Sequence, residues 1–291
     1  MSDLTSTPTR SPSALAVPVT AEGVTRAAYA YTGGKPLDPA LPTVVFIHGA
    51  LHDHSVWTLL ARWCAHHGRN ALAVDLPGHG RSAGPVLGSI GALADWVLAL
   101  LDAAGVPADN DVALMGHSMG SLIALEAAAR APARVKRLIL VGTAYPMKVS
   151  PALLDTSANA PLKAIDMVNS FSISSLASKP SYPGPGMWLH GSNRALMRRT
   201  LAGPNATGCA VNLFHHDFQL CDAYADGLAA AAKVACPVTF VLGDADQMTP
   251  PKATREIATA LKARVLTLHS GHSQAAEDPD GLLAALKTAL A

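Results

Sequence analysis

The pentapeptide Gly116-His117-Ser118-Met119-Gly120 constrains the fold of this chain most, because it joins two segments of opposite character. The segment before it, 111–115, is short, apolar and β-prone, whereas the segment after it, 121–130, has the composition of a helix. A Gly-x-Ser-x-Gly pattern between a strand and a helix predicts a sharp turn that exposes Ser118 at its tip. The two glycines favour this turn because a Cβ atom at either position would clash.

Strand-like and helix-like segments alternate through most of the remaining chain. This alternation predicts an α/β fold with a mainly parallel sheet flanked by helices. Right-handed crossovers would bring the loops after the strands together at the carboxyl edge of the sheet. The other predicted strands are an antiparallel pair at 15–19 and 24–31, then 43–47, 71–74, 135–141, 237–242 and 264–268; the other predicted helices are 57–67, 90–104 and 280–290.

One stretch breaks this rhythm. Residues 146–224 show no clear β pattern and are rich in Ser, Pro and Gly, most densely at 181–186. We therefore predict a flexible tail at 1–13, a core formed by 14–145 and 225–291, and an inserted, mostly helical cap or lid at 146–224. The alternative is that 146–224 form a second folded domain with a function of its own.

Composition excludes several classes of function. A chain of 291 residues can bury roughly 75% of its unfolded surface, and a net charge of +1 creates no strong field for nucleic acid. No apolar run approaches the roughly 18 residues of a membrane span, and residues 1–13 lack the pattern of a secretory signal. The cysteines show no C-x-x-C pairing, which favours reduced thiols. We expect a cytoplasmic protein, monomeric or homodimeric.

A serine hydroxyl becomes a good nucleophile only when a base removes its proton and a carboxylate orients that base. Two loops after predicted strands offer these groups in the order acid, then histidine. Asp246 is favoured over Asp244 as the acid, because a residue past the turn can reach the histidine. His272 is favoured over His269 as the base, because Gly271 lets its loop bend toward Ser118. The predicted catalytic residues are therefore Ser118, Asp246 and His272.

A tetrahedral intermediate on Ser118 carries a negative oxygen that needs hydrogen-bond donors. One predicted donor is the backbone N–H of Met119, at the start of the helix, where the helix dipole also helps. The other lies in the loop His48-Gly49-Ala50-Leu51, after the strand at 43–47. Ala50 is the preferred donor of this oxyanion hole, and Leu51 is the alternative.

These motifs together resemble the α/β-hydrolase superfamily, in the group whose oxyanion loop begins with His-Gly. The resemblance runs from about Val24 to the C-terminus and rests on the following motifs: His48-Gly49, Asp75-x-Pro77-Gly78-His79-Gly80-x-Ser82, the turn at 116–120, Gly243-x-x-Asp246 with Thr249-Pro250, and Gly271-His272. It implies an eight-stranded sheet with a helical cap between the sixth and seventh strands, and it supports Asp246 over Asp244. No motif in the cap matches the family.

The remaining histidine motifs are interpreted as structural. His52-Asp53-His54 looks like a metal cluster, but adjacent loop residues rarely face one ion, so no metal is expected. His52 or His54 could instead line the mouth of the pocket. His117 is expected to pack under the turn, and Asp75 with His79 to set a loop. For His215-His216-Asp217 a solvated helix face is favoured over contact with substrate.

The predicted function is a serine hydrolase that cleaves a small or medium, largely apolar ester or related acyl compound, without metal or cofactor. The same catalytic residues support a lactonase, thioesterase, perhydrolase or carbon–carbon bond hydrolase. Ser118 argues against relatives with Asp at the turn, the haloalkane dehalogenases and epoxide hydrolases. A non-catalytic ligand receptor is the alternative from another class. The candidates for lining the substrate pocket are Leu51, Phe171, Met187, Trp188, Phe214 and Phe218.

Overall fold

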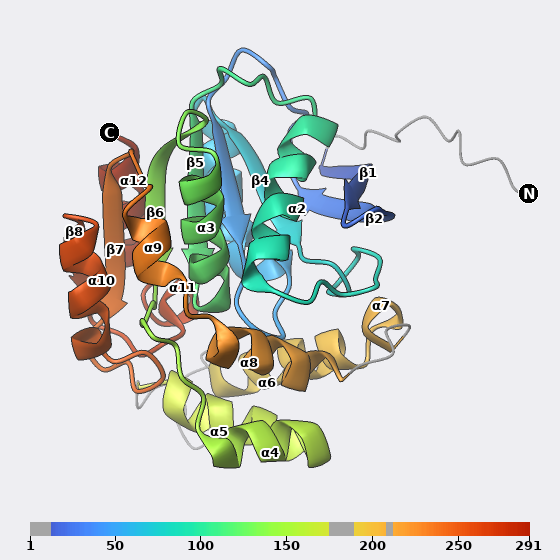
Figure 1. The fold of residues 1–291 in the computed structure, drawn as a ribbon, viewed down its shortest axis with the longest axis vertical. Coiled ribbons are helices and arrows are strands. Elements are labelled where there is room, and N and C mark those ends of the chain that lie inside the picture. Colours follow the sequence, from blue (N-terminus) through green and yellow to red (C-terminus); the bar gives the residue numbers. More distant parts are fainter. Residues whose placement is uncertain (1–12, 175–188, 208–211) are drawn as a thin grey trace, which may run out of the picture.

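The computed structural model describes residues 13–174, 189–207 and 212–291 (Figure 1). Its centre is one sheet in the order β1-β2-β4-β3-β5-β6-β7-β8. The first two pairings, β1 with β2 and β2 with β4, are antiparallel, and all the others are parallel. This confirms the predicted eight-stranded α/β fold. The strands are β1 (Ala14–Ala21), β2 (Val24–Tyr31), β3 (Thr43–Ile47), β4 (Asn70–Asp75), β5 (Val112–His117), β6 (Val135–Val141), β7 (Val238–Gly243) and β8 (Arg264–Leu268).

Helices cover both faces of this sheet, so its central strands are buried along their whole length. One face packs against α2 (Ile90–Ala103), α3 (Met119–Arg130), α9 (Gly227–Ala231) and α10 (Arg255–Ala260). The opposite face packs against the 3-10 helix η1 (His54–Trp57), α1 (Thr58–His66) and α12 (Pro279–Leu290). In Figure 1, α2 and α3 lie in front of the sheet. Two short helices, η3 (Pro251–Thr254) and α11 (Gln274–Glu277), complete the C-terminal part.

Among the described residues between β6 and α9, the helices are α4 (Pro151–Asn159), α5 (Pro161–Ser172), α6 (Leu189–Leu201), α7 (Pro204–Thr207) and α8 (Leu213–Ala223). They gather beyond one end of the strands, at the bottom of Figure 1. Below, "cap segment" means residues 146–224. The candidates Met187 and Trp188, and the dense Ser-Pro-Gly run at 181–186, lie outside the described residues.

The cap segment shares an apolar cluster with one loop of the core. Leu51, which follows β3, is fully buried in this cluster together with Phe214 and Phe218 of α8. Burial of side chains of this size contributes roughly 2 kcal/mol each, so the cluster holds the cap segment against the carboxyl edge of the sheet. Across the three described ranges, no helix combines the length and apolar character needed to cross a membrane.

Candidate active site

Ser118 sits between the last residue of β5 and the first residue of α3, in a backbone conformation of φ 52° and ψ −120°. A positive φ is uncommon for a residue with a Cβ atom and marks a sharply constrained turn. The turn is tight on both sides. A Cβ atom on Gly116 would clash with the carbonyl of Gly120, and one on Gly120 would clash with the carbonyl of Ile47. Only glycine therefore fits at positions 116 and 120, two residues before and two residues after this serine.

His272 and Asp246 meet on neighbouring loops after β8 and β7. The His272 Nδ1 atom lies 2.8 Å from Asp246 Oδ2, and both residues are buried. The Thr249 hydroxyl donates to the same Oδ2 at 2.7 Å. Burial alone would raise the pKa of Asp246, but His272 and Thr249 outweigh it and lower this pKa below its ordinary value. The carboxylate is therefore charged and accepts the Nδ1 proton, which leaves Nε2 as the basic atom of the ring.

The two alternative residues, Asp244 and His269, pair with each other instead. His269 Nδ1 lies 2.7 Å from Asp244 Oδ2, and the histidine side chain is 97% exposed. The hydrogen bond to Asp244 raises the pKa of His269. This second Asp–His pair lies on the surface of the same two loops.

Ser118 and His272 line the same small cavity, which has a volume of about 30 Å³. Gly49 and Ala50 form another part of its wall, and a Cβ atom built on Gly49 would lie 3.2 Å from Ser118 Cβ. The cap segment contributes Val168, Ser172, Asn193, Met197, Phe214 and Phe218 to the lining. The cavity thus lies between the core loops and the cap segment.

The two predicted oxyanion-hole donors lie near Ser118, because Met119 follows it directly and Ala50 lines the same cavity. Met119 begins α3, so its N–H has no acceptor within the helix. Ala50 lies in the tight turn 49–52, where the N–H of His52 donates to the carbonyl of Gly49 at 3.3 Å. The alternative donor, Leu51, is already engaged, because its N–H donates to Asp217 Oδ2 at 2.8 Å.

A larger cavity of about 620 Å³ adjoins the small one and shares His52, His117, Asn193 and Ser273 with it. Apolar side chains of α1, α6 and α12, such as Leu60, Leu196 and Leu282, line most of it. Its volume lies within the usual range for small-molecule pockets. The candidate Phe171 is 49% exposed on α5 and lines neither cavity.

His52 and His117 stand where the two cavities meet. His117 Nε2 lies 2.8 Å from the carbonyl oxygen of His272, as expected for a residue that packs beside the turn. His52 Nε2 lies 2.9 Å from Asn193 Oδ1 on α6, while its Nδ1 is buried without a partner within the described residues. Burial lowers the pKa of His52 to about 4, so this ring is neutral at pH 7. Of the two histidines considered for the pocket mouth, His52 lines the cavities.

The structure corrects the interpretation of His215-His216-Asp217 as a solvated helix face. Asp217 is 1% exposed, and its Oδ2 lies 2.9 Å from His79 Nε2. Burial alone would lower the pKa of His79, but the Asp217 carboxylate outweighs it and raises this pKa. A signal was available in the sequence: helical spacing puts Asp217 on the same stripe as Phe214, Phe218 and Cys221.

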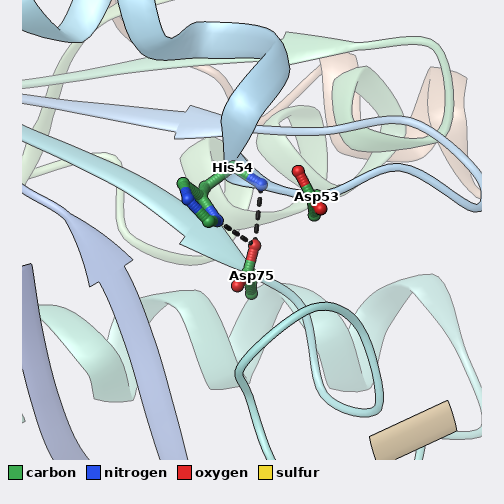
Figure 2. A group of neighbouring side chains, drawn as sticks. All are labelled: Asp53, His54 and Asp75. Atoms are coloured by element: carbon green, nitrogen blue, oxygen red, sulfur yellow. Dashed lines mark hydrogen bonds and ion pairs between the residues drawn. The ribbon is translucent and has the colours of Figure 1, made fainter. Parts of the chain in front are cut away.

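Asp53, His54 and Asp75 form a group of three potential metal ligands whose atoms lie within 4.8 Å of one another (Figure 2). Protein donors already occupy their carboxylate oxygens. Asp75 Oδ1 accepts from the backbone N–H of His54 at 2.7 Å and lies 2.8 Å from His54 Nδ1. Its Oδ2 accepts from the N–H of Arg81, and Asp53 accepts from Ser55 and Arg199. The group ties the loop after β3 to the end of β4 and, through Arg199, to α6, and His54 faces Asp75 rather than these two cavities.

His48 is a buried neutral histidine in this region. Its Nδ1 lies 2.8 Å from the carbonyl oxygen of Gly49, and its Nε2 accepts from the N–H of Leu76 at 3.1 Å. Burial, together with the neighbouring His79, lowers the pKa of His48 from 6.5 to about 4. Protonation would break the bond from Leu76.

We expect His48 to make the protein less stable in acid. The unfolded chain takes up a proton near pH 6.5, but the folded chain does not until about pH 4. The free energy of unfolding should therefore fall through this window, with about 3 kcal/mol attributable to His48. Urea unfolding at pH 7 and pH 4 should show a smaller loss for His48→Gln than for the unmodified protein. Equal losses would contradict the assignment.

Comparison with known proteins gives one family and several relatives. Residues 42–279 match the profile of a family described as alpha/beta hydrolase fold. The chain is 33% identical over 243 residues to a pimeloyl-[acyl-carrier protein] methyl ester esterase of Chromobacterium violaceum, covering 77% of this chain and 84% of that protein. Among solved structures, the enol-lactonase of Burkholderia xenovorans superposes with a TM-score of 0.77 at 22% identity, covering 94% of this chain and 99% of that one.

A shorter match is more similar in sequence. Over 113 residues the chain is 38% identical to the dihydrolipoyllysine-residue acetyltransferase component of the acetoin cleaving system of Pseudomonas putida. This match covers 38% of the chain and 28% of that protein. The chain therefore spans less than a third of the length of that relative.

Proposed function

The chain belongs to the α/β-hydrolase family, and from this premise we propose that it is a serine esterase whose triad is Ser118, His272 and Asp246. The observation that carries the proposal is the placement of Ser118 and the His272–Asp246 pair. The serine is held at φ 52° on a glycine-lined turn, and it shares a cavity with a histidine that is bound 2.8 Å from a buried carboxylate. A nucleophile, a base and an orienting acid are the three groups that acyl transfer needs.

The proposed reaction follows from these positions. His272 Nε2 takes the proton of Ser118 as its Oγ attacks the ester carbonyl, while Asp246 stabilises the charged ring. The N–H groups of Met119 and Ala50 donate to the negative oxygen of the tetrahedral intermediate. His272 then gives the proton to the departing alkoxide, which leaves an acyl group on Ser118. Water, activated by the same histidine, releases the acid.

A fluorophosphonate probe tests this mechanism directly, because it phosphonylates only serines that a neighbouring base activates. We expect the purified protein to be labelled at a single site, mapped to Ser118 by peptide mass spectrometry, and Ser118→Ala to remain unlabelled. An unlabelled wild-type protein, or equal labelling of the variant, would rule out the serine hydrolase mechanism and favour the ligand-receptor alternative.

We propose that the cavity of about 620 Å³ takes the acyl chain of the substrate. It adjoins the cavity at Ser118, and most of its lining surface is apolar. Such a pocket favours an apolar acyl group of small to medium length. The match to a methyl ester esterase over most of the chain supports an ester as substrate, with lactones and thioesters as the alternatives to include in a substrate panel.

Leu196→Trp should shorten the acyl chain that the enzyme accepts, because the indole ring fills part of this cavity. We expect kcat/KM for long-chain p-nitrophenyl esters to fall about tenfold or more, and that for acetate to change little. Leu162→Trp is the matched control, since Leu162 is 48% exposed on α5 and lines neither cavity. If Leu196→Trp left the dependence of kcat/KM on acyl chain length unchanged, the proposal that the acyl chain binds in this cavity would be wrong.

A small acyl compound is the proposed partner, bound by a monomer or homodimer without cofactor. A cytoplasmic location is supported by Cys64 and Cys221, which are free and buried. Burial raises the pKa of both thiols, and that of Cys64 to about 12, so both thiols are protonated and unreactive at pH 7.

A further inference from the structure

Asp217, a residue of the cap segment, touches the loop that supplies the proposed oxyanion-hole donor. It lies on α8, whose N-cap is Asn212; the Asn212 side chain accepts the N–H groups of Phe214 and His215. The Asp217 carboxylate is almost fully buried, and its Oδ2 accepts the N–H of Leu51 at 2.8 Å across 166 residues of sequence. Leu51 directly follows Ala50.

The backbone of Leu51 needs such support. Its φ is 54°, in the left-handed region that glycine favours and that a leucine rarely adopts. Leu51 is the third residue of the turn 49–52, the position at which a positive φ normally calls for glycine. A non-glycine residue keeps this conformation only where its surroundings determine it.

The same helix supplies two of the contacts that determine it. The Leu51 side chain is buried in the apolar cluster that contains Phe214 and Phe218, and its N–H is bound by Asp217. Asp217 itself is fixed by His79, which lies 2.9 Å away on the loop after β4. An ionised carboxylate is a stronger acceptor than a neutral group, so this bond can hold the strained turn.

We infer that Asp217 is a positioning residue for the oxyanion hole. By holding the peptide between Ala50 and Leu51, it aims the N–H of Ala50 at the oxygen of the tetrahedral intermediate. Because Asp217 belongs to α8, the oxyanion hole is complete only when this helix of the cap segment lies against the sheet. This inference rests on the proposed function, since it assumes that acyl transfer occurs at Ser118.

Replacing the acceptor tests the inference. Asp217→Ala leaves the N–H of Leu51 without its partner, and we expect kcat to fall about 10²-fold with KM nearly unchanged. Asp217→Asn keeps an acceptor oxygen, so it should restore kcat to within about fivefold of wild type. Asp222→Ala is the matched control. Asp222 is also on α8 and also accepts a backbone N–H, but its donor is Val149, which lies outside the loop of the proposed oxyanion hole.

An inhibitor that imitates the tetrahedral intermediate separates positioning from a general structural effect. An alkyl trifluoromethyl ketone forms an oxyanion when Ser118 adds to it, so its Ki should rise in Asp217→Ala by the same factor as kcat/KM falls. Simple destabilisation of the fold would lower the melting temperature and leave the Ki of the folded fraction unchanged. Should Asp217→Ala fail to fold because it leaves the buried His79 ring without its hydrogen-bond partner, Asp217→Ala/His79→Leu removes both polar groups and carries the same expectation.

Three outcomes overturn the inference: full kcat and inhibitor affinity in Asp217→Ala, the same losses in Asp222→Ala, or no recovery in Asp217→Asn. None of these affects labelling of Ser118 by a fluorophosphonate in the wild-type protein. If that labelling is absent, the proposed function itself fails, so the two failures are distinguishable.

Discussion

His272→Ala should lower kcat for ester hydrolysis about 10⁶-fold, as large a loss as removal of the Ser118 hydroxyl should cause. The proposed base is the only group described here that both lines the cavity at Ser118 and is oriented by a buried carboxylate. Without it, Ser118 keeps its proton and remains a weak nucleophile. Initial rates with p-nitrophenyl acetate, measured at high enzyme concentration, would give the residual activity.

His269→Ala provides the control, because it removes a histidine that also carries an Asp hydrogen bond on the same loop. Its side chain is 97% exposed, so we expect kcat to stay within about twofold of wild type. If His269→Ala were the inactive variant and His272→Ala retained its rate, the base would be misassigned. A loss in both variants would point to the loop as a whole rather than to either ring.

Asp246→Asn should lower kcat about 10⁴-fold while leaving the fold intact. The asparagine oxygen can keep the bonds that Asp246 Oδ1 accepts from the N–H groups of Met248 and Thr249, both at 2.8 Å. Its amide nitrogen, however, would donate to His272 Nδ1. This bond favours the tautomer with the proton on Nε2, which cannot accept the proton of Ser118.

The comparison variant is Asp244→Asn, in which the exposed pair with His269 is changed in the same way. We expect its rate to match wild type within about twofold, since this carboxylate pairs with the exposed His269 and does not line the cavity of Ser118. Circular dichroism and thermal melts of both variants would show whether any loss of activity reflects unfolding. An inactive Asp244→Asn beside an active Asp246→Asn would reverse the assignment.

Much of the fold could be predicted because the signals are local. The strands at 43–47 and 135–141 were predicted with the bounds that the structure shows, since runs of buried β-branched and apolar residues define them. The turn at Ser118 could be predicted equally well, because a strand, the two glycines around the serine and a helix lie within a few residues of one another. Parallel strands then bring their carboxyl ends to one edge, which is why Asp246 and His272 were expected beside Ser118.

The surroundings of the site could not be predicted in the same way. Periodicity leaves 146–224 as a stretch without strands, and it cannot say which helix face meets which loop. Asp217 was therefore placed on a solvated face, although it is buried against Leu51 and His79. These two hydrogen bonds join Asp217 to Leu51, 166 positions away, and to His79, 138 positions away. No local sequence pattern encodes contacts over such separations.

By itself, the sequence determined the order of the eight strands along the chain. It also determined the chemistry available at the carboxyl edge: a serine on a glycine turn, and two carboxylates and two histidines on two later loops. Local sterics and side-chain periodicity act over a few residues, so neighbouring positions in the sequence are enough to reveal them. Only the tertiary structure decided that Asp244 and His269 pair at the surface while Asp246 and His272 pair in the interior. It also decided that a buried carboxylate of the cap segment holds the turn at Leu51, because burial and long-range hydrogen bonds exist only once the layers have packed.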